Sequence, residues 1–187
     1  MFYLQPNQKR LLSSLNPLFF ILAVFGLILA KTACYPLAPH FVQKWDLLLP
    51  FVVFFGQRRG LAEGIILSLF SAHLFSLSSG APLGVYTTAY LAIFAVARLI
   101  SYVVYAQTLV SILLLMIGLS LLSRVILPLV AGFFHDAWPI LSFSNLVWWS
   151  IFLNGVAGWA IYVVLVLIDR LTNKVARNSI EFSGDSL

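Results

Sequence analysis

The sequence predicts an all-α protein, a bundle of about six transmembrane helices of which the second is short. Of its 187 residues, 61% are hydrophobic and only 9% are Asp, Glu, Lys or Arg, whereas about a quarter of an average soluble domain is charged. The apolar runs are continuous rather than alternating, which favours helices over the strands of a barrel. This composition excludes a soluble enzyme and a nucleic-acid-binding domain. We assign the net charge of +5 to loops that lie beside anionic membrane lipids.

The first crossing is Leu11–Ala30, an uncharged run that Lys31 ends. Its length suffices, because a helix needs about 20 largely apolar residues to cross a bilayer. Thr32-Ala33-Cys34 has some likeness to a lipoprotein cleavage site, but Lys31 stands where such a site has an aliphatic residue. We therefore expect this helix to be retained. Cys34 is the only cysteine, which excludes an internal disulfide and a cysteine-based metal cluster.

The second crossing, Leu47–Gln57, is unusually short. Its 11 uncharged residues lie between Asp46 and Arg58, and Pro50 interrupts them. Such a run is either a short crossing buried among its neighbours, with Trp45 as an interfacial anchor, or a re-entrant half-helix. We favour the short crossing because it brings the charges of the whole chain into agreement.

Two crossings follow in the stretch Gly64–Ala97, which contains no Asp, Glu, Lys or Arg. This stretch is too long for one crossing, and the turn formers of Ser78–Gly84 divide it. We predict helices at Gly60–Leu77 and Gly84–Tyr105, joined by a tight turn at the membrane surface.

The last two crossings are Gln107–Val130 and Leu146–Ile168. We expect Gly132 to end the former, and His135 to lie in the more polar loop that follows. Residues 1–177 then form a single transmembrane domain, and the polar residues 178–187 form a disordered tail.

Six crossings place most basic residues on one side of the membrane, which the positive-inside rule makes the cytoplasmic side. Both termini are then cytoplasmic. Without the short second crossing, Arg58 and Arg59 would face the other way and the pattern would be lost. The basic residues on the cytoplasmic side are Lys9, Arg10, Arg58, Arg59, Arg170, Lys174 and Arg177.

The sequence contains no constellation typical of a catalytic or metal site. His40, His73 and His135 lack Cys, Asp or Glu partners at ligand spacing. There is no nucleophile elbow and no phosphate-binding glycine loop. We therefore expect a protein that is not an enzyme and that carries no cofactor.

Ionisable residues within the predicted crossings cost free energy in the membrane, so we expect each of them to have a structural or functional role. Arg98 and Arg124 either extend to the lipid headgroups or bind a neighbouring helix or a partner. Glu63 follows Arg59 by four residues, which predicts a structural ion pair. His73 lies in the middle of its crossing, where we expect a buried, neutral and hydrogen-bonded ring.

The last crossing contains a polar residue followed by two glycines. We expect Asn154 to hydrogen-bond across helices, and Gly155 and Gly158 to allow another backbone to approach closely. Trp148 and Trp149 are typical of an aromatic belt at the interface. Several serines give Gly60–Leu77 and the turn after it a polar side, suited to helix packing or to a groove for a small solute. These serines are Ser68, Ser71, Ser76, Ser78 and Ser79.

Several segments, and the order in which they follow one another along the chain, resemble the rod-shape-determining protein MreD family. The most distinctive is the turn with Ser79, Gly80, Pro82 and Gly84. The sequence differs from the family at Ser76, where Asp is usual, and at Trp45, where Pro is usual. The resembling segments are Lys44-Trp45-Asp46-Leu47-Leu48, Arg59-Gly60-Leu61-Ala62-Glu63-Gly64, Ser79-Gly80-Ala81-Pro82-Leu83-Gly84-Val85-Tyr86, Trp149-Ser150, Asn154-Gly155 and Trp159.

The resemblance implies a non-enzymatic component of the bacterial cell-wall elongation complex in the inner membrane. Family members bind MreC, and through it the MreB filaments and the glycosyltransferase and transpeptidase of wall synthesis. The family is also thought to resemble the small-molecule-binding subunits of energy-coupling-factor transporters. A transport subunit is therefore the alternative, with an outward-facing polar pocket built from the serine-rich helix and the turn.

Overall fold

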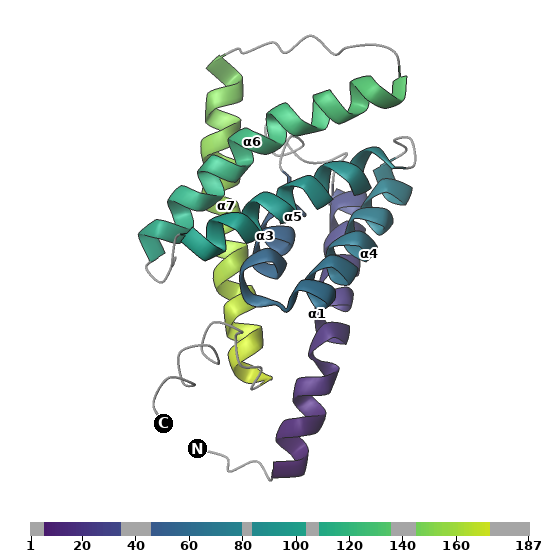
Figure 1. Cartoon of the computed structure of the whole chain (residues 1–187), viewed down its shortest axis with the longest axis vertical. Helices are drawn as coiled ribbons and strands as arrows, with labels where there is room; N and C mark the ends of the chain where they lie inside the picture. Colours follow the sequence, from purple (N-terminus) through teal and green to yellow (C-terminus); the bar gives the residue numbers. More distant parts are fainter. Residues whose placement is uncertain (1–5, 35–45, 80–83, 104–108, 136–144, 173–187) are drawn as a thin grey trace.

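The computed structural model describes residues 6–34, 46–79, 84–103, 109–135 and 145–172. Within these ranges the chain is helical (Figure 1), and five of the helices are long and apolar enough to cross a membrane. The predicted polytopic helical protein is confirmed at this level. The helices in the described residues are α1 (Pro6–Cys34), α3 (Leu49–Arg58), α4 (Leu61–Ser79), α5 (Val85–Val103), α6 (Leu109–His135) and α7 (Asn145–Leu171).

The helix bounds agree with the predicted crossings to within about five residues, and the largest differences are at the start of α1 and the end of α6. Gly132 does not end this helix, which continues to His135. The expectation that His135 lies in a loop was therefore wrong. A glycine costs a helix only about 1 kcal/mol, which is less than the cost of leaving backbone groups without partners in an apolar environment.

α3 is the short helix that lacks the length of a full crossing. Its 10 residues give about 15 Å at 1.5 Å per residue, roughly half of the hydrocarbon core. Leu49 to Gln57 are all buried, because α4, α5, α6 and α7 pack around this helix. The structure thus confirms a short helix buried among its neighbours, and the choice of a crossing over a re-entrant half-helix stays a prediction.

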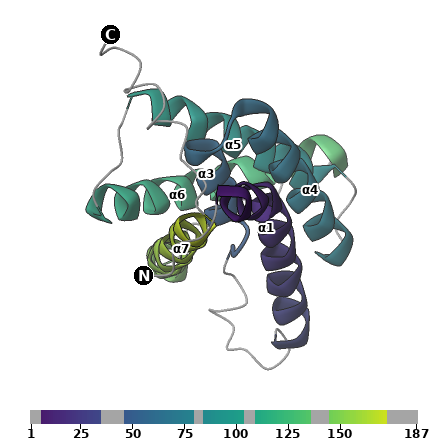
Figure 2. The same ribbon diagram turned by 90° about the horizontal axis from the view of Figure 1, so that it is seen from below.

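The other helices surround α3, as the view from below shows (Figure 2). α1 and α7 run along the length of the molecule, while α4, α5 and α6 cross it obliquely (Figure 1). Aromatic rings fill the space between α1, α3 and α7. The ring of Phe54 stacks on Phe20 with centroids 5.1 Å apart, and it meets the edge of Tyr162 at 5.5 Å.

α3 also approaches α5 at a glycine. A Cβ atom on Gly56 would lie 3.1 Å from the Cβ atom of Ala97 and 3.3 Å from the carbonyl oxygen of Phe94. These distances are tighter than ordinary van der Waals contact. The absence of a side chain at Gly56 therefore lets the two backbones pack closely.

Candidate functional site

Buried polar side chains gather in two groups, one at each end of α3. The group at its C-terminal end we call the Arg59 cluster, and the group at its N-terminal end we call the Asp46 cluster. Polar groups at such depth in a membrane protein are expensive, so they mark the places where structure or function requires them. The Arg59 cluster consists of Asn16, Arg59, Glu63, Asp169 and Thr172, and the Asp46 cluster consists of Asp46, Tyr90 and Asn154.

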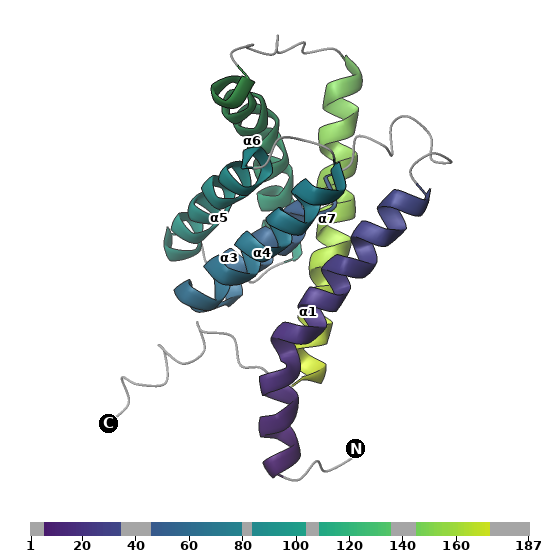
Figure 3. The same ribbon diagram turned by 90° about the vertical axis from the view of Figure 1, so that its right-hand side faces the viewer.

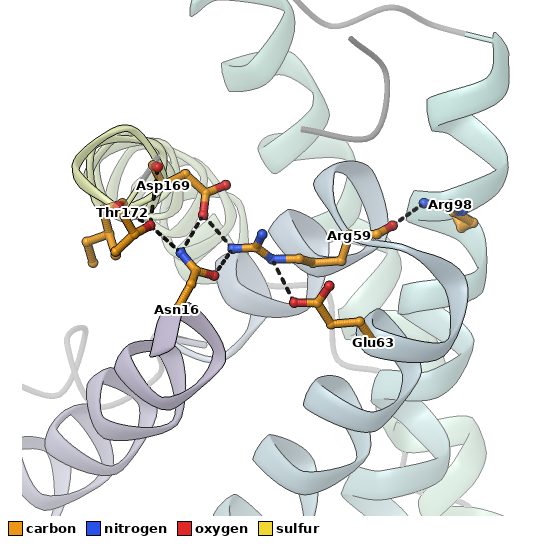
Figure 4. Close-up of polar contacts among 7 residues, drawn as sticks. Asn16, Arg59, Glu63, Arg98, Asp169 and Thr172 are labelled. Atoms are coloured by element: carbon orange, nitrogen blue, oxygen red, sulfur yellow. Dashed lines mark hydrogen bonds and ion pairs between the residues drawn. The ribbon is translucent and has the colours of Figure 1, made fainter. Parts of the chain in front are cut away.

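Arg59 is the centre of the first cluster (Figure 4). It directly follows α3, and only 1% of its surface is exposed. Its Nη2 atom donates to Asn16 Oδ1 at 2.7 Å and to Asp169 Oδ1. Its Nε atom lies 3.8 Å from Glu63 Oε1, which confirms the predicted pairing of these two residues. The guanidinium group also lies over the Phe20 ring, 4.8 Å from its centroid.

Asn16 completes this cluster by joining α1 to α7. Its Nδ2 atom donates to Asp169 Oδ1 at 3.1 Å and to Thr172 Oγ1 at 2.5 Å. The Arg59 cluster therefore fastens the first half of α1, the connection from α3 to α4 and the end of α7 to one another. These three parts of the chain lie at the same end of the bundle.

Arg98 contacts the same region from α5. Its Nη1 atom donates to the carbonyl oxygens of Gly56 and Arg59 at 3.0 and 2.8 Å. These carbonyls belong to the last turn of α3, where a helix lacks internal donors and a cation is favourable. The side chain is 6% exposed. Of its two expected roles, Arg98 therefore has that of binding a neighbouring helix.

The Asp46 cluster fixes the start of α3. Asp46 Oδ1 accepts a hydrogen bond from the backbone N–H of Leu49 at 3.2 Å, in the manner of a helix cap. The same oxygen accepts from the hydroxyl of Tyr90 on α5 at 2.5 Å. The backbone N–H of Asp46 donates to Asn154 Oδ1 on α7 at 2.8 Å. Asn154 was predicted to hydrogen-bond across helices, and in the structure it bonds from α7 to the segment directly before α3.

Burial on one side, and hydrogen bonds and nearby cations on the other, have opposite effects on the pKa of Asp46. Burial raises the pKa of its carboxyl above the ordinary value, because the charged form loses its hydration. The hydrogen bonds from Tyr90 and Leu49, and then the charges of Lys31 and Arg124, act to lower it. Arg124 itself donates from Nη2 to Ser150 Oγ at 2.7 Å, so this arginine joins α6 to α7 inside the bundle.

The two predicted glycines of α7 differ in their surroundings. A Cβ atom on Gly155 would collide with the side chain of Ile117 and lie 3.2 Å from its Cα atom. A Cβ atom on Gly158 would meet Met116 Sδ at an ordinary 3.5 Å. α6 and α7 therefore approach closely at Gly155, and Gly158 leaves room for a methyl group.

His73 is not buried, although the sequence led us to expect a buried ring. Its side chain is exposed on the outer side of α4, so the expectation of a buried ring was wrong. Helical periodicity explains the difference, because Ser68, Ser71, Ala72 and Phe75 form the inner side of α4. His73 lies on the opposite side of the helix from these residues.

The structure describes only the two ends of the family-like turn, Ser79 and Gly84. Ser79 ends α4, and Gly84 precedes α5 with φ +105°, a conformation that favours glycine. Gly80, Pro82 and the expected tail 178–187 lie outside the described residues, as do His40, Trp45 and Lys44. Trp148 and Trp149 are exposed near the start of α7.

Asn16, Tyr90, Asp169 and Thr172 are the cluster residues that the sequence did not single out. Asn16 is a polar residue within an otherwise apolar crossing, a signal that by itself indicates a role. Asp169 lies one residue beyond the predicted last crossing, Leu146–Ile168, yet α7 extends past it to Leu171. Its pairing with Arg59 joins residues 110 positions apart, which no local pattern reveals.

The two clusters consist of hydrogen bonds and ion pairs that hold helices together. Each carboxylate in them has a donor or a cation beside it: Asp46 has Tyr90, and both Asp169 and Glu63 have Arg59. Within the described residues, no group of three or more His, Cys, Asp or Glu side chains is arranged to hold a metal ion.

Neither a protein-family model, nor a curated protein, nor a solved structure matches this chain.

Proposed function

We propose that this chain is an MreD-like, non-enzymatic component of the bacterial cell-wall elongation complex. In this proposal it lies in the inner membrane, binds MreC as its main partner and helps to organise peptidoglycan synthesis. MreB and the wall-synthesis glycosyltransferase and transpeptidase associate with it through MreC.

The observation that best supports this proposal is that the family-like segments supply the joints of the fold. Asp46 caps α3, and Arg59 centres the larger cluster. In the same segment as Arg59, a Cβ atom on Gly64 would lie 3.1 Å from the carbonyl oxygen of Phe55 on α3. Gly155 allows a close contact of α6 with α7. At these residues, the likeness to the family concerns side chains and glycines that determine the architecture.

The polar groups of the bundle agree with a role in assembly. Arg98 and Arg124, the two arginines within the crossings, donate to groups on neighbouring helices. Hydrogen bonds of this kind between helices favour a rigid body, and a rigid body presents its helix faces to lipid or to other proteins with little ordering cost.

Co-purification from native membranes in a mild detergent, followed by mass spectrometry, tests the proposal. We expect MreC to be recovered together with wall-synthesis enzymes, and depletion of the protein to round the cells. Recovery of a properly folded protein without MreC, together with normal cell shape after depletion, would contradict it.

The alternative, a small-molecule-binding subunit of an energy-coupling-factor-type transporter, has one observation in its favour. Asp46 Oδ2 and Asn154 Nδ2 are buried and have no hydrogen-bond partner within the described part of the chain, and the charges of Lys31 and Arg124 act on the same carboxylate. An acceptor, a donor and two cations near one another suit a polar solute. Recovery of a membrane coupling subunit with paired ATPases in the same experiment would favour this alternative.

A further inference from the structure

Arg98 on α5 is a buried cation that has no counter-ion within the described part of the chain. Its Nη1 atom donates to the two α3 carbonyls, whereas its Nε and Nη2 atoms are buried and have no hydrogen-bond partner there. The ion pairs among the described residues are those of Arg59 with Glu63 and Asp169. A guanidinium group does not lose its proton in proteins. The group that completes this site is therefore an acceptor, and a negative charge on it would balance the buried cation.

The carboxylates of the Arg59 cluster do not take this place. The guanidinium group of Arg59 points toward Asn16 and Asp169, whereas Arg98 reaches the backbone of Arg59 from the opposite direction (Figure 4). The arrangement of the helices agrees, because α3 and α4 lie between α5 and α1 (Figure 3). Glu63 and Asp169 are both paired with Arg59. Arg98 is thus a separate cationic site at the same end of the bundle.

The surface beside Arg98 is apolar and faces outward. Leu99 and Tyr102 follow it on α5, and each is 65% exposed. The Tyr102 ring lies against the guanidinium group, with its centroid 5.4 Å from Cζ. Tyr102 is also the last residue of Val85–Tyr102, a stretch apolar enough to cross a membrane, and tyrosines are frequent where such stretches meet the lipid headgroups. Arg98 lies about 6 Å deeper along the helix axis, within the reach of its long side chain.

A phospholipid combines the two properties that this site requires. Its phosphate group matches the planar fork of a guanidinium group, and its acyl chains match the exposed apolar surface of α5. Basic sites between membrane helices bind anionic headgroups in this way. We propose that Arg98 binds the phosphate group of an anionic phospholipid through Nε and Nη2, while Nη1 stays bonded to α3. Rotation of the exposed Tyr102 side chain gives the phosphate access to these two donors.

Lipid titration of the purified full-length chain tests this proposal. The protein is delipidated in a neutral detergent, and its Tm is followed as phosphatidylglycerol or phosphatidylcholine is added. A ligand that binds only the folded state raises the Tm. We expect a larger rise with phosphatidylglycerol, because phosphatidylcholine carries no net charge to balance the cation. Inorganic phosphate at the same concentration should give no rise, since it has no acyl chains to bind the apolar surface.

Three variants, each compared with its own lipid-free Tm, separate lipid binding from folding. Arg98→Gln is expected to weaken phosphatidylglycerol binding roughly 10-fold or more, as loss of a charge-assisted hydrogen bond does, although its amide can still donate to α3. Arg98→Lys keeps the charge and a donor for α3 but not the fork, so an intermediate affinity is expected. The matched control is Arg170→Gln, which removes an exposed arginine near the end of α7 and should have a much smaller effect.

Four results would overturn the proposal. They are equal Tm rises with the two lipids, an affinity that Arg98→Gln and Arg98→Lys leave unchanged, an equal loss in Arg170→Gln, and an Arg98-dependent rise with inorganic phosphate alone. A protein that co-purifies with the parent chain and is lost from Arg98→Gln alone would also overturn it, because a protein group would then occupy the site. The titration does not involve MreC, so its failure would leave the proposed function standing, and the reverse also holds.

Discussion

At the scale of single residues, Arg59 shows how a buried charge is accommodated in this bundle. A guanidinium group out of water is costly unless its donors are used and its charge is balanced. Arg59 has Asp169 and Glu63 as counter-ions, the Asn16 amide as an acceptor, and the ring of Phe20 against its face. Removal of Arg59 would leave the buried carboxylate of Asp169 without its cation, so the free energy at stake is that of the network rather than of one hydrogen bond.

We predict that Arg59→Met lowers the free energy of unfolding in detergent by about 3–5 kcal/mol, the usual cost of breaking a buried ion pair. The double variant Arg59→Met with Asp169→Leu should recover a large part of this loss, because no uncompensated charge then remains. Glu63→Gln is the control: Glu63 is 30% exposed and 3.8 Å from Arg59, so we expect a loss below about 1 kcal/mol. Additive losses in the double variant would contradict this account.

Asp46 gives a prediction for the dependence of stability on pH. Burial raises the pKa of this carboxyl above its ordinary value of 3.8. The folded protein therefore holds the proton more tightly than the unfolded chain, and the resulting stabilisation is lost as the pH rises through the raised pKa. We expect Asp46→Asn to flatten the stability profile above pH 3.8 relative to the parent protein, as measured by thermal unfolding in detergent across pH. Parallel profiles for the two proteins would refute this assignment.

At the scale of helices, the contact of α6 with α7 depends on a single glycine. We predict that Gly155→Ala costs about 1–3 kcal/mol, the usual cost of overpacking, because the added methyl group would collide with Ile117 and lie 3.3 Å from its backbone nitrogen. Gly158→Ala, in the same helix, should be neutral or slightly stabilising, since its methyl group has room beside Met116 and alanine favours a helix.

Thermal unfolding of both glycine variants in detergent checks this prediction. Adding Ile117→Ala to Gly155→Ala should restore only part of the stability, because the backbone of α6 still lies in the way. Equal effects of the two glycine substitutions would mean that the helices are not in close contact at this point.

The helices were predictable from the sequence because hydrophobic length is a local signal. Gly60–Leu77 and Leu61–Ser79, the expected and observed bounds of α4, differ by one or two residues. The side of a helix that faces the bundle is a weaker signal when both sides are apolar, and His73 was misplaced for this reason. The partners of Arg59 were hidden for another reason, since a contact over 110 positions depends on the arrangement of the whole bundle.

At the scale of the whole molecule, the two polar clusters fasten the bundle at two levels. The Arg59 cluster joins α1 to α7, and the Asp46 cluster joins the start of α3 to α5 and α7. α3 connects the two levels through its own length. This arrangement makes the short helix the structural centre of the molecule, even though it lacks the length of a full crossing.

The same arrangement predicts the topology of the chain. α1 begins and α7 ends at the same end of the bundle (Figure 1), and Asn16 bonds to Asp169 there. Five crossings would leave these two helix ends on opposite sides of the membrane, whereas the path through α3 returns the chain to its starting side. The basic residues near this end favour the cytoplasm. We therefore expect alkaline phosphatase fused to either terminus to be inactive and a fluorescent protein at either terminus to be bright. An active phosphatase at one terminus alone would mean that the path through α3 does not complete a crossing.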